Sequence, residues 1–119
     1  MLAAFNKYVN ATGGVLDNST NLLRITNAQY ESLQPLNFVI DGDTFELTPN
    51  AQIWPRALNI AIHGDEDAIY LAVGDLGNKF PGADFICGMA FLERYYSVFD
   101  SGNRRVGFAR TPFTNATTN

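Results

Sequence analysis

The fold of this chain is predicted most clearly by one stretch, Phe91-Leu-Glu-Arg-Tyr-Tyr-Ser-Val-Phe-Asp-Ser-Gly-Asn-Arg-Arg-Val-Gly-Phe-Ala-Arg110. Its middle predicts a β-hairpin, because residues 95–99 are aromatic or β-branched and the turn formers Asp, Ser, Gly and Asn follow them. Residues 104–109 then alternate, with Val106 and Phe108 on one face. The stretch is therefore expected to end the fold as two paired strands.

The rest of the chain predicts further short strands and a few helical turns. Asp41-Gly42 between two strand-like runs is typical of a type I′ hairpin, and Thr48-Pro49 has the sequence of a helix cap followed by a first-turn proline. Asn27 is expected to cap another turn. The predicted strands are 22–26, 36–40, 43–47, 57–62, 69–73 and a buried 85–87, and the predicted helical turns are 3–9, 27–31, 48–54 and 89–94. We expect one mostly β domain, residues 1–119.

Composition excludes several classes of function. The 119 residues are long enough to bury a core, and 46% of them are apolar. A net charge of −4 argues against a nucleic-acid partner, because phosphate binding needs a basic surface. No apolar run approaches membrane-spanning length, and the start Met-Leu-Ala-Ala-Phe-Asn lacks the basic and apolar regions of a signal peptide. We expect neither nucleic acid nor membrane as a partner.

Metal and thiol chemistry are not expected either. The single cysteine, Cys87, excludes an internal disulfide, and its apolar neighbours predict a buried, inert thiol. The single histidine, His63, has no second histidine with which to hold zinc. The acidic residues at 41, 43 and 65–67 lack the spacing of a calcium loop and are expected to be solvated turns. We therefore predict no metal and no cofactor.

Three Asn-X-Thr sequons, at Asn10, Asn18 and Asn115, are predicted glycosylation sites. A sequon is a short pattern that arises by chance, but three in one short chain favour a parent protein that passes through the secretory pathway.

Residues 88–109 resemble the closing segment of the pepsin-like aspartic endopeptidases, above all the fungal polyporopepsin type. In that family the segment reads approximately Gly-Asp-x-Phe-Leu-Arg-x-Tyr-Tyr-x-Val-Phe-Asp-x-x-Asn-x-x-Ile/Val-Gly-Phe-Ala, and here Met89 replaces the first aspartate. Residues 33–42 also resemble the family phrase Leu-Pro-x-Ile-x-Phe-x-Ile-x-Gly, with one residue inserted. The resemblance covers about residues 3–113 and implies the C-terminal lobe of the acid-protease β-barrel fold, with two or three short helices.

The resemblance also implies what this chain lacks. In this family each lobe supplies one Asp-Thr/Ser-Gly loop, and the two aspartates share a proton during peptide-bond hydrolysis at acid pH. The second-lobe loop would precede the segment that matches residues 3–8, so we expect no catalytic residue here and no activity without an N-terminal lobe. The complete enzyme would act on peptides or proteins and would be secreted or vacuolar. Phe80, Ile86 and Met89 are the expected substrate-cleft residues, unless they pack in the core.

Two alternatives remain open. Asp100-Ser101-Gly102 looks like a catalytic motif, but it continues with Asn103 rather than Ser or Thr and is expected to be a tight turn. A single-lobed protease that works as a homodimer would instead use Asp100 as its catalyst. Alternatively, the chain is a freestanding module that binds peptide, glycan or protein. As a lone lobe or as such a module, the chain is expected to form a homodimer through its exposed lobe interface.

Overall fold

Short strands and helices follow one another along the chain in the computed structural model, which describes residues 2–77 and 81–119. The α-helices are α1 (Leu2–Thr12), α2 (Asn27–Glu31), α3 (Pro49–Gln52) and α4 (Met89–Leu92). The strands are β1 (Val15–Leu16), β2 (Leu23–Ile25), β3 (Leu36–Ile40), β4 (Asp43–Leu47), β5 (Ile69–Leu71), β6 (Tyr95–Asp100) and β7 (Arg105–Arg110). Three 3₁₀ turns are η1 (Arg56–Leu58), η2 (Ile60–Ile62) and η3 (Ser101–Asn103).

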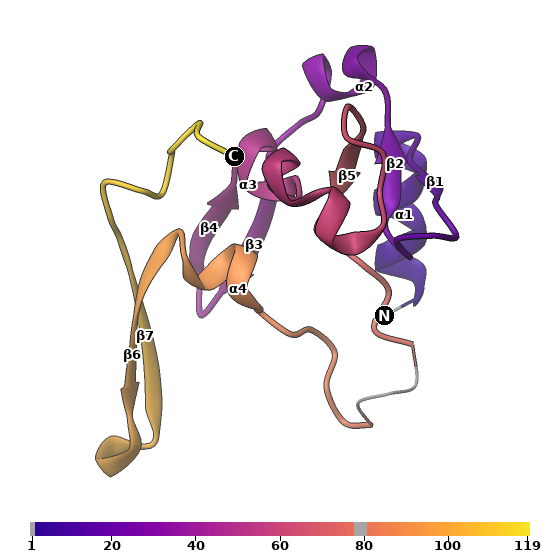
Figure 1. Cartoon of the computed structure of the whole chain (residues 1–119). Coiled ribbons are helices and arrows are strands. Elements are labelled where there is room, and N and C mark those ends of the chain that lie inside the picture. Colours follow the sequence, from indigo (N-terminus) through magenta and orange to yellow (C-terminus); the bar gives the residue numbers. More distant parts are fainter. Residues whose placement is uncertain (1, 78–80) are drawn as a thin grey trace.

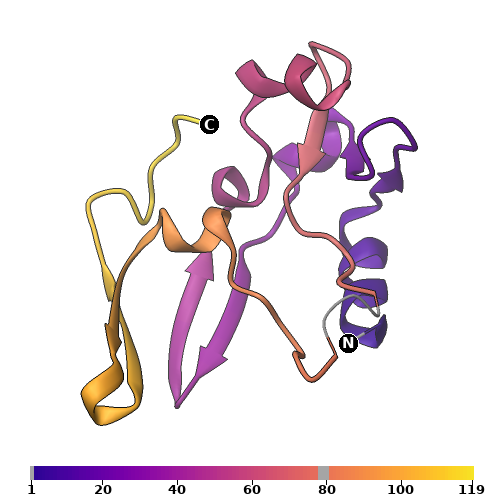
Figure 2. The same ribbon diagram turned by 60° about the horizontal axis from the view of Figure 1, so that its bottom comes forward.

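The strands of the described residues form three small antiparallel sheets, ordered β1-β2-β5, β3-β4 and β6-β7. In Figure 1, α1 lies beside β1 and β2, whereas the β6–β7 hairpin projects away from the rest of the molecule. Figure 2 gives the same arrangement from another side, with the β6–β7 hairpin and α1 at opposite sides of the molecule. The hairpin thus extends well beyond the core.

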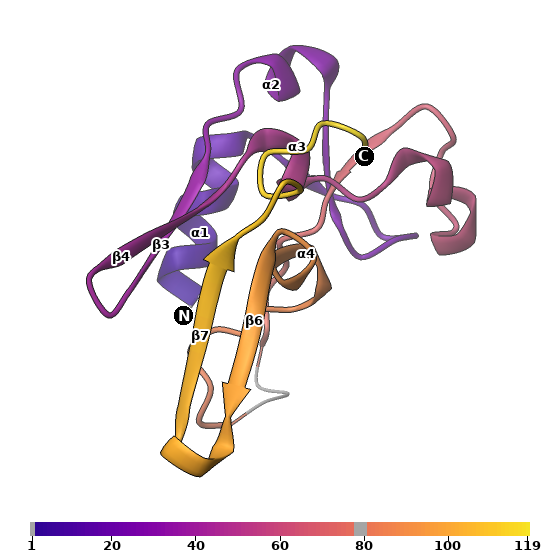
Figure 3. The same cartoon turned by 90° about the vertical axis from the view of Figure 1, so that its left-hand side faces the viewer.

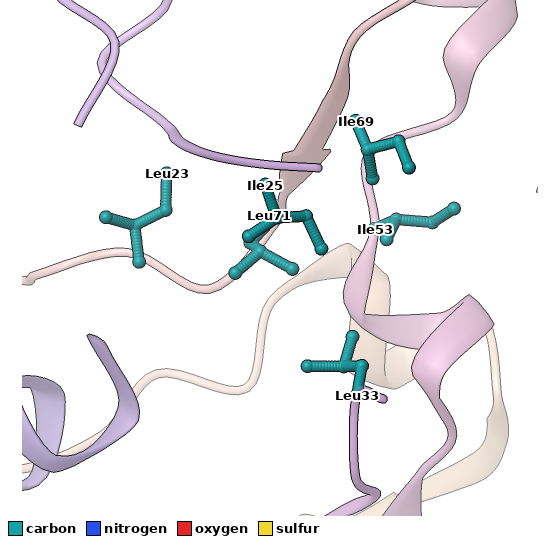
Figure 4. Close-up of a cluster of buried hydrophobic side chains, with 6 residues drawn as sticks. All are labelled: Leu23, Ile25, Leu33, Ile53, Ile69 and Leu71. Atoms are coloured by element: carbon teal, nitrogen blue, oxygen red, sulfur yellow. The ribbon is translucent and has the colours of Figure 1, made fainter. Parts of the chain in front are cut away.

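One core cluster forms where β2, β5 and the segment after α3 meet. Its buried members, drawn in Figure 4, are Leu23, Ile25, Leu33, Ile53, Ile69 and Leu71. The apolar side of α1 packs on this cluster through Phe5, Tyr8 and Val9, which recur at helical spacing. Ile53 also forms an isolated antiparallel bridge with Leu71. Burial of these aliphatic side chains is the main stabilising contribution in this half of the molecule.

A second, aromatic cluster anchors the projecting hairpin. Phe91 of α4 stacks on Tyr95 with ring centroids 5.0 Å apart, and Phe45 meets Tyr95 edge to face at 5.3 Å. Phe108 of β7 packs edge to face against Phe91 at 5.2 Å. Such offset and edge-to-face pairs add to the free energy of burial. Only the base of the hairpin is held in this way.

Gln52 joins the two clusters by hydrogen bonds. Its side chain is fully buried, and its Nε2 donates to the carbonyl oxygens of Gln34 (2.9 Å) and Leu47 (3.0 Å). Its Oε1 accepts from the hydroxyl of Tyr8 at 2.9 Å. The amide at the end of α3 therefore links α1 to the segment before β3 and to the end of β4.

Several predicted local structures are confirmed. Residues 36–47 form the β3–β4 hairpin, and Asp41 and Gly42 both have positive φ, as a type I′ turn requires. The side chain of Thr48 caps α3, with Pro49 in the first turn. The prediction that Asn27 caps α2 is wrong by one residue, because Thr26 is the N-cap and forms a capping box with Gln29.

The predicted strand at residues 57–62 is wrong, because this segment forms the 3₁₀ turns η1 and η2. Buried Asn59 explains the difference, since its Nδ2 donates to the carbonyls of Asp65, Glu66 and Ala68 at 2.9–3.1 Å. Its own carbonyl accepts from the amide of Gly64 at 2.9 Å. A polar residue thus points inward, and the apolar Leu58 and Ile60 that flank it remain 48% and 65% exposed.

The predicted buried strand at residues 85–87 is also wrong. Phe85 and Ile86 are exposed, Cys87 is half-buried, and the segment has no strand assignment. The sequence has the β propensity of a strand, but a strand also needs a partner for its backbone groups. Within residues 2–77 and 81–119, no strand pairs with this segment.

The end of the chain is held by Arg94, a buried cation. Its guanidinium donates to the carbonyls of Phe113 (3.3 Å) and Ala116 (2.6 Å) through Nη1, and to Oδ1 of Asn50 (3.1 Å) through Nη2. The hydroxyl of Thr114 in turn donates to the Arg94 carbonyl at 2.6 Å. These bonds fix the segment after β7 against α3 and α4.

Candidate functional site

A cavity of about 320 Å³ opens between α1, the β3–β4 hairpin and the segments on either side of residue 80. Such a volume matches the small end of ligand and substrate sites. Its walls are mainly apolar. The lining residues are Ala4, Phe5, Tyr8, Leu36, Phe38, Leu47, Ala72, Val73, Gly74, Asp75, Leu76, Asp84, Phe85, Ile86, Cys87, Gly88, Met89, Ala90 and Phe91.

Two of the three residues predicted for a substrate cleft lie at this cavity. Ile86 and Met89 both line it, and their side chains are 52% and 79% exposed. The two side chains are therefore not packed in a core, which was the alternative to a substrate-cleft role. Phe80 lies outside the described residues. An apolar segment, Phe85 to Met89, thus forms an open rim of the cavity, and we call it the 85–89 rim.

Two polar side chains of the cavity wall, Tyr8 and Cys87, stay protonated because they are partly buried. Burial raises the pKa of the Tyr8 phenol well above its ordinary value, and its hydroxyl donates to Gln52. Burial also raises the pKa of the Cys87 thiol. Cys87 was predicted to be buried and is in fact half-buried, but the raised pKa agrees with the predicted low reactivity, because the thiolate is the reactive form.

The cavity contains carboxylates but no catalytic motif of the aspartic-protease type. Asp75 and Asp84 line it, and they continue as Asp-Leu-Gly and Asp-Phe-Ile. Oδ1 of Asp75 accepts from the amide of Gly77 at 3.0 Å, which is the bond of a local turn. Neither residue has the Thr or Ser that follows the aspartate in the family's catalytic loop.

Asp100 ends β6 and caps η3, the turn that joins β6 to β7. Figure 3 shows this hairpin projecting from the rest of the molecule, and Asp100 is not among the residues that line the cavity. Its Oδ2 accepts from Nδ2 of Asn103 and from Nε of Arg105, both at 2.8 Å. These bonds, first that from the Asn103 side chain and then that from Arg105, lower the pKa of the Asp100 carboxyl. When two carboxyl groups share a proton, the pKa of one of them is raised, which is the opposite of the shift at Asp100. The geometry therefore fits the predicted turn.

The β6–β7 hairpin exposes apolar side chains over much of its length. Tyr96, Val98, Phe99 and Val106 are all exposed, Phe99 to 70%. Val39 and Ile40 at the end of β3 are exposed too. Exposed apolar side chains grouped on one element mark a surface that associates with another one.

Sequence reasoning missed most of the cavity. Phe5 and Tyr8 of α1 and Phe38 of β3 line it, although each belongs to a run that was interpreted only as a helix or strand. The apolar spacing on α1 was a usable signal, since Phe5, Tyr8 and Val9 share a face. That this face would border a cavity depends on segments far apart in the chain.

No group of three or more His, Cys, Asp or Glu side chains in residues 2–77 and 81–119 is arranged to hold a metal ion. None of the helices in the part of the chain that the structure describes is both long enough and apolar enough to span a membrane. The asparagines of all three sequons, Asn10, Asn18 and Asn115, are exposed.

Comparison with known proteins defines the class of this fold. The family model for eukaryotic aspartyl proteases matches residues 3–111, so the chain belongs to that family. The crystal structure of an aspartic proteinase from Irpex lacteus superimposes with a TM-score of 0.91 at 61% sequence identity, over 98% of this chain and 34% of that one. This confirms the expected pepsin-like fold.

Individual relatives give the same result. The chain is 61% identical over 117 residues to polyporopepsin of Irpex lacteus, which covers 98% of this chain and 34% of the relative. It is 42% identical over 79 residues to gastricsin of Oryctolagus cuniculus and 28% identical over 119 residues to cathepsin E of Aquarana catesbeiana. The chain thus spans about a third of the length of polyporopepsin and corresponds to a C-terminal part of the fold.

Proposed function

We propose that residues 1–119 act as the C-terminal lobe of a two-lobed aspartic endopeptidase that hydrolyses peptide bonds at acid pH, and that the chain is inactive alone. The observation that carries this proposal is the match to the Irpex lacteus aspartic proteinase structure over 98% of the chain, combined with a cavity wall whose aspartates are not in Asp-Thr/Ser-Gly motifs. The parent protein would be secreted or vacuolar, which the three sequons support.

The chemistry explains why one lobe is not enough. Two carboxyl groups at close distance cannot both ionise, so one holds a proton while the other activates water for attack on the peptide carbonyl. Asp75, Asp84 and Asp100 offer no such pair: the first and last are engaged in local turns, and the pKa of Asp100 is lowered. The catalytic pair would come from the rest of the protein.

In the assembled enzyme, the 85–89 rim would contact substrate side chains. Ile86 and Met89 are apolar side chains that line the cavity and are exposed to solvent. Such a surface suits a subsite for an apolar peptide side chain. Phe80 stays a candidate for the same role from the sequence. An Ile86→Ala, Met89→Ala double variant should raise KM for peptides with apolar side chains on the leaving side, by roughly 10-fold for the lost contact area.

The N-terminal lobe would cover the surfaces that are unusually apolar here. The hairpin residues Tyr96, Val98, Phe99 and Val106 are all exposed, and apolar side chains grouped in this way favour association with another surface. The backbone of residues 85–87 also lacks a strand partner among the described residues. A second lobe that packs on the hairpin and adds a strand beside this segment would satisfy both features.

The test is reconstitution of peptidase activity from two chains. The 119-residue chain is mixed or co-expressed with the part of Irpex lacteus polyporopepsin that precedes the matched region, which on this proposal would supply the catalytic carboxyl pair. Acid peptidase activity is then measured with and without pepstatin. We expect no cleavage by the chain alone and pepstatin-sensitive cleavage by the pair. A pair that binds without cleaving would contradict the assignment.

A control variant separates the homodimer alternative. If the chain alone cleaves peptides and Asp100→Asn abolishes this, two copies form the carboxylate pair and the two-lobe proposal is wrong. The geometry of Asp100 speaks against that outcome, because its carboxylate is already bound by Asn103 and Arg105. In the reconstituted pair, Asp100→Asn should leave kcat within about twofold, since a surface turn contributes little to chemistry.

The second candidate is a freestanding module that binds a peptide, glycan or protein and forms a homodimer through its exposed lobe interface. One observation favours it: the apolar hairpin and the 85–89 rim are exposed on the same chain as an open cavity. Sedimentation at micromolar to millimolar concentration tests it. Absence of peptide, glycan and protein binding would leave only the lobe proposal, whereas a monomer at every concentration would contradict the homodimer that both proposals predict for the isolated chain.

A further inference from the structure

We propose that Asn115 is the main N-glycan acceptor of the folded chain, and that local structure disfavours the sequons of Asn18 and, most strongly, Asn10. The sequence treats the three sites alike, since each is Asn-X-Thr. The inference does not depend on the proposed protease function. It follows from how each asparagine and its sequon threonine are held.

N-glycosylation uses both the asparagine and the threonine of a sequon. The side-chain nitrogen of the asparagine forms a bond to C1 of the first sugar, while the C1–O bond to a lipid-linked pyrophosphate breaks. The pyrophosphate leaves on its lipid, and the amide gives up one proton to a base. The threonine hydroxyl must be available for recognition, because the pattern requires Ser or Thr at this position. A hydroxyl that is buried or already hydrogen-bonded is a poorer target.

The Asn115 sequon satisfies these conditions. Asn115 and Thr117 are both exposed, and in the part of the chain that the structure describes neither side chain forms a hydrogen bond. The backbone is nevertheless ordered, since Arg94 binds the carbonyls of Phe113 and Ala116 on either side. Thr114 points inward and Asn115 outward, so the acceptor is presented on a fixed surface turn.

The Asn10 sequon is the least suitable. Asn10 lies in the last turns of α1, and its sequon threonine, Thr12, is buried. The Thr12 hydroxyl donates to the carbonyl of Val9 and accepts from the amide of Gly14, both at 3.3 Å. To expose this hydroxyl, the end of α1 must unwind and detach from the core. The sequon is thus accessible at Asn10 and blocked at Thr12.

The Asn18 sequon is intermediate. Asn18 is exposed in a surface loop, but the Thr20 hydroxyl donates to Oδ1 of Asp17 (3.2 Å) and accepts from the amide of Leu22 (3.2 Å). Oδ1 of Asp17 also accepts from the amides of Ser19 and Thr20, at 2.9 Å each. The Asp17 carboxylate therefore closes the loop around the sequon, and its removal should open it.

The experiment measures occupancy at each site in a eukaryotic secretory host. The chain is produced behind a secretion leader, and peptide N-glycosidase converts each glycosylated asparagine to aspartate, which peptide mass spectrometry counts. We expect occupancy at Asn115 to exceed that at Asn10 several-fold, with Asn18 between them. Thr117→Val should abolish modification of Asn115, and Thr117→Ser should retain it.

Two controls link the result to structure. Short synthetic peptides of residues 7–15, 15–23 and 113–119 lack the fold and should accept glycan to similar extents from the same transferase. Asp17→Ala, which removes the acceptor of these bonds, should raise occupancy at Asn18 and leave Asn10 unchanged. Equal occupancy of the three asparagines in the chain, an unmodified Asn115, or an Asn18 occupancy that does not respond to Asp17→Ala would each overturn the proposal.

Discussion

Replacing Gln52 by leucine should lower the free energy of unfolding by more than the loss of one hydrogen bond would, because the Gln52 amide makes three. The buried amide of Gln52 bonds the carbonyls of Gln34 and Leu47 and accepts from Tyr8, so Gln52→Leu leaves two carbonyls and one hydroxyl without their partner. A buried polar group without a partner costs about 1–3 kcal/mol. Because some of these groups can relax toward water, we expect a loss of about 3–5 kcal/mol in the free energy of unfolding.

The assay is urea unfolding followed by circular dichroism, with Tyr8→Phe as the matched variant. Tyr8→Phe removes only one bond and should cost about 1–2 kcal/mol. The double variant should cost less than the sum of the two, since both single changes break the same Tyr8–Gln52 bond, and we expect a coupling of about 1 kcal/mol. A Gln52→Leu protein within about 0.5 kcal/mol of the original would refute the reasoning, because surface changes alone reach that size.

Three further predictions concern the chain end, a tight turn and pH. Arg94→Met should free the residues that follow β7, because Ala116 and its neighbours lose their donor; limited proteolysis should then cut there first, and unchanged protection would exclude the proposed clamp. Gly13→Ala should cost about 1–2 kcal/mol, because the residue has a φ of +67° and its new Cβ would lie 2.6 Å from Gln29; thermal melting tests this, and an unchanged midpoint would disprove it. The Asp100 carboxyl should titrate below its ordinary pKa of about 3.9 by NMR, so its stabilisation of the hairpin tip is present above that value and is lost as pH falls through the lowered pKa; a normal midpoint would contradict the hydrogen bonds described here.

Local structure was mostly encoded by short sequence patterns. The β3–β4 and β6–β7 hairpins, the cap of α3 by Thr48 and the end of α1 at Gly13 depend on residues adjacent in the chain. Turn geometry and capping act over four or five residues, so propensity and spacing suffice to predict them. The family resemblance of residues 88–109 was likewise visible in the sequence, and the comparisons confirmed it.

The two wrong strand predictions, at residues 57–62 and 85–87, share one cause: whether a segment is buried and paired depends on residues far away in the chain. Residues 57–62 alternate like a strand, yet Asn59 turns inward to bond three carbonyls and leaves its apolar neighbours outside. Residues 85–87 have the composition of a strand, but no partner strand lies beside them in the described part of the chain. The sequence by itself determined the family resemblance and the two hairpins. Only the tertiary structure decided which side chains line the cavity, how Arg94 and Gln52 join distant segments, and which sequon is free, because each of these depends on contacts between residues far apart in the chain.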